Sequence, residues 1–410
     1  MHALPSPIAA DRSSVASTHV AKMDIRHLVF DMSVSHDLKA NGVYNVARQL
    51  AAEQAAAGEN AKLILLREEG QAAPTEPSLD LQVLPLEGRK VLGRRVSINA
   101  DILQSMTAGH SGTTFFHIHT ARQPLLLPIA SYLRKHAIPY AITVHGRYSH
   151  VFDQHNNPTY RLTALYLQNV ERRVLEGARF VQGLSALECR LIRSIAPRAR
   201  VEHVSNAAYS SRFEGCPIRP ARTSASSRFP TFGYLGRYEI QHKGLDLLMA
   251  GFAAYRSAGG CGVLELVGTG PAREEIAGQA QAFGVADYVT IDGPRFGAEK
   301  ARVLAAWDYF VMPSRFEGVP IGALEAGLAG LPLILSAATG LREQLAEFRA
   351  GFGIEALTGE AVAYAFHQAE CCSAEQWSDM SGAAYRMALS IGDWTKIAAQ
   401  LVALYQRPGQ

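Results

Sequence analysis

Short apolar runs alternate with amphipathic stretches along most of the chain. In the first half the apolar runs predict β-strands, and the polar-interrupted stretches between them predict helices. Residues 42–58 place Val43, Val46 and Leu50 at helical spacing, so one face of this predicted helix is apolar and packs on a sheet. This alternation is typical of parallel α/β layering. The predicted strands cover residues 27–32, 62–66, 114–119, 140–145, 180–184 and 201–204.

The same alternation stops after Asn206 and restarts in the second half. Residues 211–228 between the two halves are rich in Pro, Ser and Arg, as expected of a linker. We therefore predict two Rossmann-like domains, over residues 23–210 and 229–390. The predicted strands of the second domain cover residues 232–235, 263–267, 288–291, 309–312 and 333–335.

Both ends of the chain differ from these domains. Residues 1–22 contain Pro, Ser and Ala and predict a flexible tail. Residues 393–405, within a terminal segment over 391–410, have one apolar face and predict a C-terminal helix. Periodicity alone does not decide on which domain this helix packs, and packing back on the N-terminal domain is one of the two options.

Composition fits an ordinary globular protein large enough for two cores. The chain has 410 residues, of which 48% are hydrophobic and 19% charged. Forty basic and 37 acidic residues give a net charge of only +3, which excludes the concentrated positive field of a dedicated nucleic-acid binder. Small anionic substrates remain compatible with this charge.

Segments that would indicate membrane insertion or secretion do not occur. No run approaches the ~18 consecutive apolar residues that a membrane-spanning helix needs, and no secretory signal is visible at the N-terminus. The five cysteines are odd in number and scattered, without a C-x-x-C pair. We expect reduced thiols in the cytoplasm, and neither a disulfide nor a zinc site.

Two carboxylates eight positions apart are the strongest candidates for chemistry. Glu317 and Glu325 follow the predicted strand over residues 309–312. If a helix begins near Pro320, Glu317 lies in the loop before it and Glu325 lies one or two turns inside it. The backbone N–H groups of residues 318–321 would then favour a phosphate, while the carboxylates accept hydrogen bonds from sugar hydroxyls. The alternative is a helix-start acid followed by a solvated glutamate.

Two cations follow the first predicted strand of the second domain. Gly236 and Arg237 come directly after residues 232–235, and Lys243 and Gly244 are predicted at a helix start. A guanidinium fork and a compact ammonium together suit a diphosphate. Taken alone, they could equally be two solvated basic side chains.

A histidine ends a predicted strand of the first domain. His145 closes residues 140–145 and should face the crevice in which open α/β sheets bind ligands. Its neutral imidazole can donate or accept a hydrogen bond. By position alone a structural role is equally open, and His117 and His119 occupy another strand end.

Two further features concern anionic ligands. The turn over residues 40–43 contains Gly42, which permits close approach of a phosphate or sugar to the backbone, or simply makes a tight turn. The chain contains no Asp-x-Asp, the carboxylate pair that would ligate a divalent cation under a nucleotide sugar. Positive charge would then come from Arg237, Lys243 and helix N-termini.

The segment PSRFEGVPIGALEAGLAGLPLI resembles the paired-glutamate motif of retaining glycosyltransferases with the GT-B fold, in particular family four of the sequence classification. It is accompanied, in the order usual for that family, by LELVGTGP, the Gly293 turn and SAATGLREQL. The resemblance covers nearly the whole C-terminal half. It implies an α/β protein of the GT-B class, with two Rossmann-like domains facing across a cleft.

The resemblance also implies roles for individual residues. It makes Arg237 and Lys243 the diphosphate clamp, and it favours His145 because the family carries a His-Gly or His-Asp pair there. It assigns catalysis to His145, Glu317, Arg237 and Lys243. It places donor contacts at Gly42, Gly236, Arg237, Lys243, Arg295, Glu317, Gly318, Val319, Pro320, Ile321 and Glu325. This chain has Asn41 before Gly42 where the family usually has two adjacent glycines.

The implied reaction is transfer of a hexose with retention of configuration, without a divalent metal or other cofactor. The donor would be a nucleotide-diphosphate sugar of the UDP-glucose or GDP-mannose type. The acceptor would be a saccharide or a polyprenyl-diphosphate-linked saccharide, in polysaccharide or glycoconjugate synthesis. Alternatives with the same fold are a nucleotide-sugar 2-epimerase, a sugar phosphorylase or a non-catalytic sugar-nucleotide-binding protein.

A basic run bears on where such an acceptor would be met. Arg89, Lys90, Arg94 and Arg95 would either contact anionic lipid at the inner face of the cytoplasmic membrane or form a solvated face.

Overall fold

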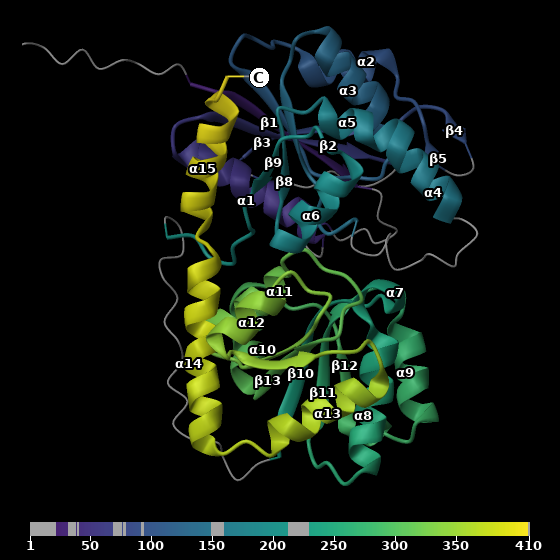
Figure 1. Cartoon of the computed structure of the whole chain (residues 1–410), viewed down its shortest axis with the longest axis vertical. Helices are drawn as coiled ribbons and strands as arrows, with labels where there is room; N and C mark the ends of the chain where they lie inside the picture. Colours follow the sequence, from purple (N-terminus) through teal and green to yellow (C-terminus); the bar gives the residue numbers. More distant parts are fainter. Residues whose placement is uncertain are drawn as a thin grey trace, which may run out of the picture.

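The computed structural model describes residues 22–31, 38, 41–68, 76, 79–91, 94–148, 160–211 and 229–408. Residues 1–21 of the predicted tail, residues 212–228 of the predicted linker and Ala40 lie outside this set. Two domains, each built on one parallel sheet, account for nearly all of the described chain (Figure 1).

The N-terminal domain contains a seven-stranded parallel sheet in the order β3-β2-β1-β6-β7-β8-β9. Its strands are β1 Asp24–Asp31, β2 Asn60–Arg67, β3 Asp80–Pro85, β6 Thr114–Ile118, β7 Tyr140–Thr143, β8 Phe180–Gly183 and β9 Val201–His203. Its helices are α1 Gly42–Ala56, α2 Ala100–Thr107, α3 Leu126–Lys135, α4 Tyr160–Tyr166, α5 Arg172–Glu176 and α6 Ala186–Ile195, with a π-helical turn over Leu167–Glu171 between α4 and α5. A small hairpin pairs β4 Lys90–Val91 with β5 Arg94–Arg95.

The C-terminal domain contains a six-stranded parallel sheet in the order β12-β11-β10-β13-β14-β15. Its strands are β10 Thr231–Arg237, β11 Val263–Thr269, β12 Val289–Asp292, β13 Tyr309–Met312, β14 Leu333–Ser336 and β15 Gly351–Ile354. Its helices are α7 Ile240–Lys243, α8 Leu245–Ser257, α9 Arg273–Ala282, α10 Gly297–Ala306, α11 Ile321–Leu328, α12 Arg342–Phe348, α13 Gly359–Glu370 and α14 Ala374–Ile391, with a 3-10 turn over Ala286–Tyr288.

The prediction of two Rossmann-like domains is therefore confirmed. The short hairpin strands β4 and β5 were not predicted, and neither were two strands of the parallel sheets, β3 and β15. β3 is an edge strand with only partial burial, and its mixed sequence DLQVLP has no continuous apolar run. β15 consists of the residues GFGI, in which glycine interrupts the apolar pattern. Both lie at sheet edges, where burial constrains the sequence least.

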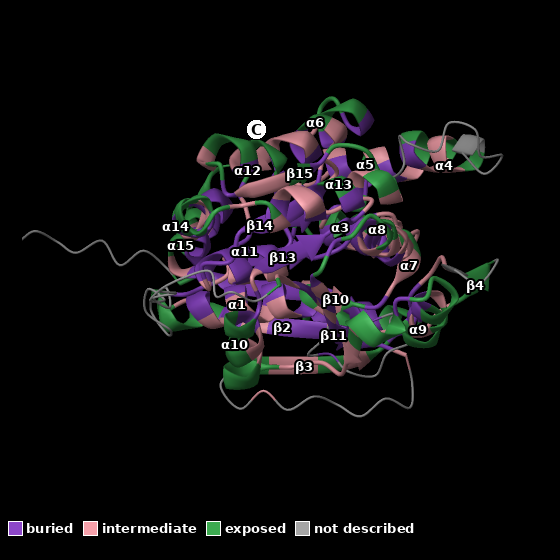
Figure 2. Ribbon diagram, turned by 90° about the horizontal axis from the view of Figure 1, so that it is seen from below, coloured by how far each residue is buried: buried purple, intermediate pink, exposed green. Residues whose placement is uncertain are grey.

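Apolar side chains form the cores between each sheet and its helices. Figure 2 shows that the strands of both sheets are largely buried, whereas exposed residues lie on the outer helices. β1 is buried along its whole length, as expected of a central strand covered on both faces. One face of the N-terminal sheet packs on α2, α3 and α5, and the other packs on α1 and the C-terminal helix. The central strands are thereby held rigidly, and their carboxyl ends can position side chains.

The last helix, α15 Trp394–Gln406, packs on the N-terminal domain although it follows α14 of the C-terminal domain (Figure 1). Ile397 and Leu401 share a core with Ile25 and Phe115 of the N-terminal sheet. α14 itself packs on α11. The chain thus crosses from one domain to the other between the ends of these two helices.

We predict that Leu401→Ala lowers the free energy of unfolding by about 2–5 kcal/mol, because Leu401 is fully buried and its removal leaves a cavity. Chemical denaturation followed by circular dichroism measures the effect. Gln400→Ala, on the exposed face of the same helix, is the control and should stay within about 0.5 kcal/mol of the parent protein. Equal stabilities of the two variants would contradict the packing of α15 on the sheet.

Candidate active site at the domain junction

The loop that carries Glu317 joins β13 to α11. α11 begins at Ile321 with Pro320 as its N-cap, so Glu317 lies in the loop and Glu325 in the second turn of the helix. The loop is fixed by backbone hydrogen bonds from Glu317 N to Ala338 O (3.2 Å) and from Gly340 N to Gly318 O (2.7 Å). The segment after β14 therefore holds the paired-glutamate loop in place.

Glu317 faces cations on its own domain. Its carboxylate forms an ion pair with Lys243 and lies 3.4 Å from His242 Nε2, and the Glu317 side chain is only 12% exposed. Burial acts to raise the pKa of Glu317, but the charges and hydrogen bonds of Lys243 and His242 outweigh burial and hold its pKa well below the ordinary range. Glu317 is therefore ionised near neutral pH.

His242 is a member of this cluster that sequence patterns did not single out. Its ring stacks on Phe316 with centroids 4.2 Å apart and an angle of 6° between the planes. Arg237 Nη2 lies 3.5 Å from His242 Nδ1, which brings Arg237 to the same cluster. The only available sequence signal was that His242 directly precedes Lys243.

The short helix α7 holds the cluster against the Glu317 loop. Arg315 donates two hydrogen bonds to the Asp246 carboxylate, at 2.8 and 2.6 Å, and its backbone N–H donates to His242 O at 2.8 Å. A bidentate pair of this kind fixes orientation as well as distance. Arg315 and Asp246 were not identified from the sequence either.

The expectation that Lys243 lies at a helix start needs a correction. Lys243 is the last residue of α7, and α8 begins only after Gly244. Gly244 has φ 64°, and a Cβ there would lie 2.2 Å from Pro313 O, so the chain turns between the two helices where only glycine fits. Arg237 is the exposed last residue of β10 and Gly236 precedes it in the strand.

Two other residues predicted to contact the nucleotide sugar, Glu325 and Arg295, each form an ion pair within the C-terminal domain. Glu325 forms an ion pair with Lys300 of α10, a residue that the sequence analysis did not select. Arg295, two residues after the Gly293 turn, lies 2.5 Å from Asp292. Glu325 and Arg295 are thus charged, half-buried and already oriented.

The start of α1 has one glycine, Gly42, preceded by Asn41, where the resembled family usually has two adjacent glycines. Gly42 is the first residue of α1, and open space surrounds the position of a Cβ. Asn41 Oδ1 accepts hydrogen bonds from Val43 N at 3.1 Å and Tyr44 N at 3.2 Å. Since Asn41 already satisfies these N–H groups, a phosphate at this helix start would have to displace its side chain.

His145 leaves β7 in a left-handed conformation. His145 has φ 52° and Gly146 has φ 76°, so the chain turns sharply at the strand end. A Cβ on Gly146 would lie 2.7 Å from Gly318 N, so the two backbones are in direct contact across the domain junction. Burial, followed by the charge of Arg147, lowers the pKa of His145 to about 3. His145 is therefore neutral, beside the Glu317 loop.

The buried side chain of Glu188 fixes the turn at His145 and Gly146 by hydrogen bonding to its backbone. Glu188 of α6 accepts hydrogen bonds from Gly146 N and from Leu184 N, the latter at 2.6 Å. Burial raises the pKa of Glu188 to about 7, against the effect of these two backbone N–H groups. Glu188 was not recognised from the sequence, because nothing in a helical glutamate indicates burial behind a distant loop.

Positive charge also reaches the junction from the N-terminal domain. Burial is the main cause that lowers the pKa of Arg147, although part of its side chain remains exposed. The charges of Arg122 and Arg237 lower this pKa further. Asn206 Nδ2 donates to Val319 O at 3.3 Å across the same junction. The structure thus brings His145, Glu317, Gly318, Val319, Lys243 and Arg237 to one region.

Features elsewhere do not compete with this region. A cavity of about 430 Å³ opens at the opposite, amino ends of β7 and β8 and contains Arg134, Arg179, Arg198 and Arg200 among its lining residues. It lacks the paired carboxylates and lies away from the strand ends where α/β sheets bind ligands. The four described cysteines are free thiols.

The basic run is partly neutralised within its own hairpin. Lys90 and Arg95 both form ion pairs with Glu68. In the described part of the chain, no helix combines the length and the apolar character needed to cross a bilayer.

Comparison with known proteins agrees with the architecture. Two parallel-sheet domains meeting at the carboxyl ends of their strands define the GT-B class of fold. A family model for "Glycosyl transferases group 1" matches residues 229–369, and one for a "Glycosyl transferase 4-like domain" matches residues 41–207. The chain belongs to the group 1 glycosyltransferases, as the sequence motifs indicated.

Individual relatives are more distant. The GDP-mannose-dependent α-(1-6)-phosphatidylinositol monomannoside mannosyltransferase of Mycobacterium tuberculosis is 29% identical over 207 residues, 48% of this chain and 54% of that protein. The chain thus spans about half the length of the curated relatives it matches first.

Solved structures match over the whole length and show the same fold. Sucrose-phosphate synthase from Thermosynechococcus elongatus has a TM-score of 0.70 at 19% identity, over 94% of this chain and 98% of that one. An Anabaena protein solved with UDP and glucose has a TM-score of 0.68 at 16% identity, over 93% and 98%.

We predict that Gly146→Ala disrupts the domain junction, because its Cβ would clash with the backbone of Gly318. Gly109→Ala is a matched control, since Gly109 has φ 66° but open space around its Cβ position. The control should lose only the about 1–2 kcal/mol of a left-handed non-glycine residue. Gly146→Ala should lose more stability and also increase the radius of gyration in small-angle X-ray scattering. Identical behaviour of the two variants would disprove the contact.

We also predict a pH dependence that originates at Glu188. Its pKa in the folded protein, about 7, lies above the ordinary 4.5, so the folded state binds the extra proton. The free energy of unfolding should therefore fall as pH rises from about 4.5 to 7, because ionisation is easier in the unfolded chain. Glu188→Gln cannot ionise and should show a flatter profile over this range. Parallel profiles would contradict the raised pKa.

Proposed function

We propose that this protein is a retaining glycosyltransferase that moves a hexose from a nucleotide-diphosphate sugar to a saccharide or lipid-linked saccharide. The observation that supports this most is the Glu317 loop. A permanently ionised carboxylate, two cations and a helix start lie together, in backbone contact with the strand-end histidine of the other domain. Such a site combines sugar recognition with stabilisation of a leaving diphosphate.

The donor diphosphate would bind to Arg237, Lys243 and the backbone N–H groups at the start of α11. Cations and a helix N-terminus are the groups that stabilise phosphate charge in proteins. Without donor, Lys243 and Glu317 neutralise each other. When donor binds, Lys243 would turn to phosphate and leave the Glu317 carboxylate to accept hydrogen bonds from hydroxyls of the transferred sugar.

The nucleoside would lie farther along α11. Glu325 would accept hydrogen bonds from the ribose hydroxyls, and its pairing with Lys300 keeps the carboxylate oriented toward α10. Arg295, now paired with Asp292, would contact the nucleotide from the turn after β12.

In the reaction, the bond between the anomeric carbon and the phosphate oxygen breaks as the acceptor hydroxyl approaches from the same face. The new glycosidic bond forms on that face, and the departing phosphate takes the acceptor proton. The negative charge that develops on the diphosphate is stabilised by Arg237 and Lys243, and electrostatic stabilisation of this kind is a major part of enzymatic rate enhancement. His145 positions a hydroxyl and is not required as a strong base.

The relatives favour some substrates over others. The mannosyltransferase relative supports GDP-mannose as the first donor to test, and the structure solved with UDP and glucose supports UDP-glucose as the second. A lipid-linked acceptor would bring the protein to the cytoplasmic face of the membrane. The hairpin of β4 and β5 is the surface to test there by flotation with anionic vesicles.

Transfer of label from radiolabelled GDP-mannose and UDP-glucose to saccharide or polyprenyl-diphosphate-linked acceptors tests the reaction. We expect Glu317→Ala and Lys243→Ala each to lower kcat/KM by about 100-fold or more, as for other groups that stabilise developing charge. Lys396→Ala, an exposed lysine of α15, is the control and should retain full activity. Unaltered sugar transfer in both Glu317→Ala and Lys243→Ala would contradict the assignment of these residues to the donor site. Conversion of the nucleotide sugar without any acceptor would favour an epimerase.

Two further measurements address mechanism. We expect activity to persist in excess EDTA, since Arg237 and Lys243 supply the positive charge that a divalent cation otherwise provides. We expect NMR of the product to show the anomeric configuration of the donor. Loss of activity in EDTA that Mg²⁺ restores, or an inverted product, would contradict the mechanism.

A further inference from the structure

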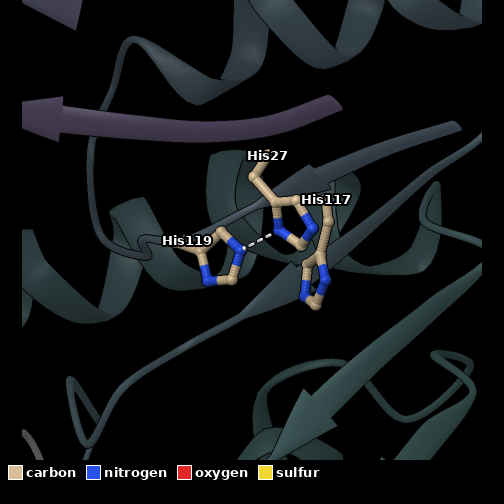
Figure 3. Close-up of side chains that lie close together, drawn as sticks. All are labelled: His27, His117 and His119. Carbon is tan, nitrogen blue, oxygen red and sulfur yellow. Dashed lines mark hydrogen bonds between the residues drawn. The ribbon is translucent and has the colours of Figure 1, made fainter. Parts of the chain in front are cut away.

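A cluster of buried histidines lies behind the candidate site. His27 of β1, His117 at the end of β6 and His119 just after it are buried side by side (Figure 3). The register explains their proximity, because His27 pairs with His117 and His119 lies two positions further on the same face. This face is apolar near the strand starts, at Ile25 and Phe115, and becomes polar toward the carboxyl ends.

Hydrogen bonds connect this cluster to the domain junction. His119 Nδ1 lies 3.3 Å from His145 Nε2, and His119 Nε2 lies 2.8 Å from His27 Nδ1. His27 Nε2 in turn lies 2.7 Å from Gln54 Oε1. Burial is the main cause that lowers the pKa of His27, His119 and His145, so each ring is neutral and carries one N–H.

A second series of hydrogen bonds begins at a backbone carbonyl, which can only accept. Gln182 Nε2 donates to Val204 O at 2.8 Å, so Gln182 Oε1 faces Thr143 and accepts its hydroxyl proton at 2.7 Å. Thr143 has then used its only proton, and His117 Nε2–H must donate to it at 2.6 Å. His117 Nδ1 is therefore bare and accepts from the Tyr405 hydroxyl at 2.6 Å.

Gln54 sets the direction of the first series. Its Oε1 lies 2.7 Å from His27 Nε2, and because an amide oxygen can only accept, His27 Nε2–H must donate to it. His27 Nδ1 is therefore bare and accepts from His119 Nε2–H.

We propose that Gln54, His27, His119 and His145 form one chain of hydrogen bonds, running in a single direction from the Gln54 amide oxygen to His145, that fixes the tautomer of His145. His27 donates to Gln54, His119 donates to His27, and His145 donates to His119, each through Nε2–H. The Nδ1 nitrogen of His145 is then always a bare acceptor. His27 and His119 are positioning residues that act through His145.

The same histidines do not suit a metal ion. One ring nitrogen from each of His27, His117 and His119 lies within 4.8 Å of the others. The rings of His117 and His119 stack with centroids 4.3 Å apart and planes 28° from parallel, so their lone pairs run alongside each other and do not converge. Both nitrogens of His117 are also engaged by Thr143 and Tyr405.

The function of the bare nitrogen rests on the transferase reaction proposed above. A sugar hydroxyl would donate its proton to the bare His145 Nδ1, whereas a ring with Nδ1–H could only donate to the hydroxyl oxygen. The chain of hydrogen bonds itself needs no substrate, so it can be tested whatever the reaction is.

Long-range ¹H–¹⁵N NMR of the full chain, labelled with ¹⁵N-histidine and without ligand, tests the tautomers. We expect His27, His119 and His145 to show the neutral Nε2–H pattern, with the His145 signals assigned by their loss in His145→Gln. An Nδ1–H pattern at His145 would overturn the proposal. So would uptake of one equivalent of Zn²⁺ that shifts His27, His117 and His119 together.

Variants then test whether the chain controls His145. In His119→Phe, His145 loses its acceptor and we expect a mixture of tautomers, with a three- to tenfold lower kcat for sugar transfer, about the effect of one lost hydrogen bond. His136→Phe, an exposed histidine outside the chain, should change neither. If His119→Phe does not fold, Gln54→Leu replaces it, since His27 then loses the acceptor of its Nε2–H and the tautomers should also mix. A single unchanged His145 tautomer in the folded variants would refute the control.

Tautomers as expected without any sugar transfer would leave the hydrogen-bond chain standing and refute only the proposed reaction. Full sugar transfer by a protein whose His145 carries Nδ1–H would refute the hydrogen-bond chain and leave the proposed reaction standing.

Discussion

The structure depends on a contact between two backbones. Gly146 at the end of β7 and Gly318 in the loop after β13 approach so closely that neither domain could place a side chain between them at Gly146. Gly340 adds a second close backbone approach, since a Cβ there would lie 2.0 Å from Gly318 O. Backbone atoms have fixed positions and no rotamers, so this contact sets the spacing of the two sheets more strictly than packed side chains would.

That contact brings together two side chains in different charge states, Glu317 of the C-terminal domain and His145 of the N-terminal domain. On the C-terminal side, Glu317 is ionised and already surrounded by the charges of Lys243 and His242. On the N-terminal side, His145 is neutral and linked to a buried polar network. An ionised carboxylate and a neutral imidazole therefore lie on opposite sides of the same junction.

Much of the fold could be read from the sequence. Central strands such as β13 are continuously apolar and were predicted with their true limits, whereas the edge strands β3 and β15 were missed because partial burial leaves a mixed pattern. Motif residues such as Glu317 were identifiable because their order along the chain is characteristic. Their partners His242, Lys300 and Glu188 were not, because each becomes relevant only through a side-chain contact that the fold creates.

The C-terminal helices set how the domains are connected. Asp393, between α14 and α15, accepts hydrogen bonds from Ser211 N at 3.0 Å and Thr395 N at 2.9 Å, and Trp394 N donates to Tyr209 O at 3.0 Å. The chain therefore passes from the C-terminal to the N-terminal domain directly beside the point where the N-terminal domain ends. A single carboxylate, that of Asp393, thus anchors both the last described residue of the N-terminal domain and the first turn of α15. Its loss would release the two segments together.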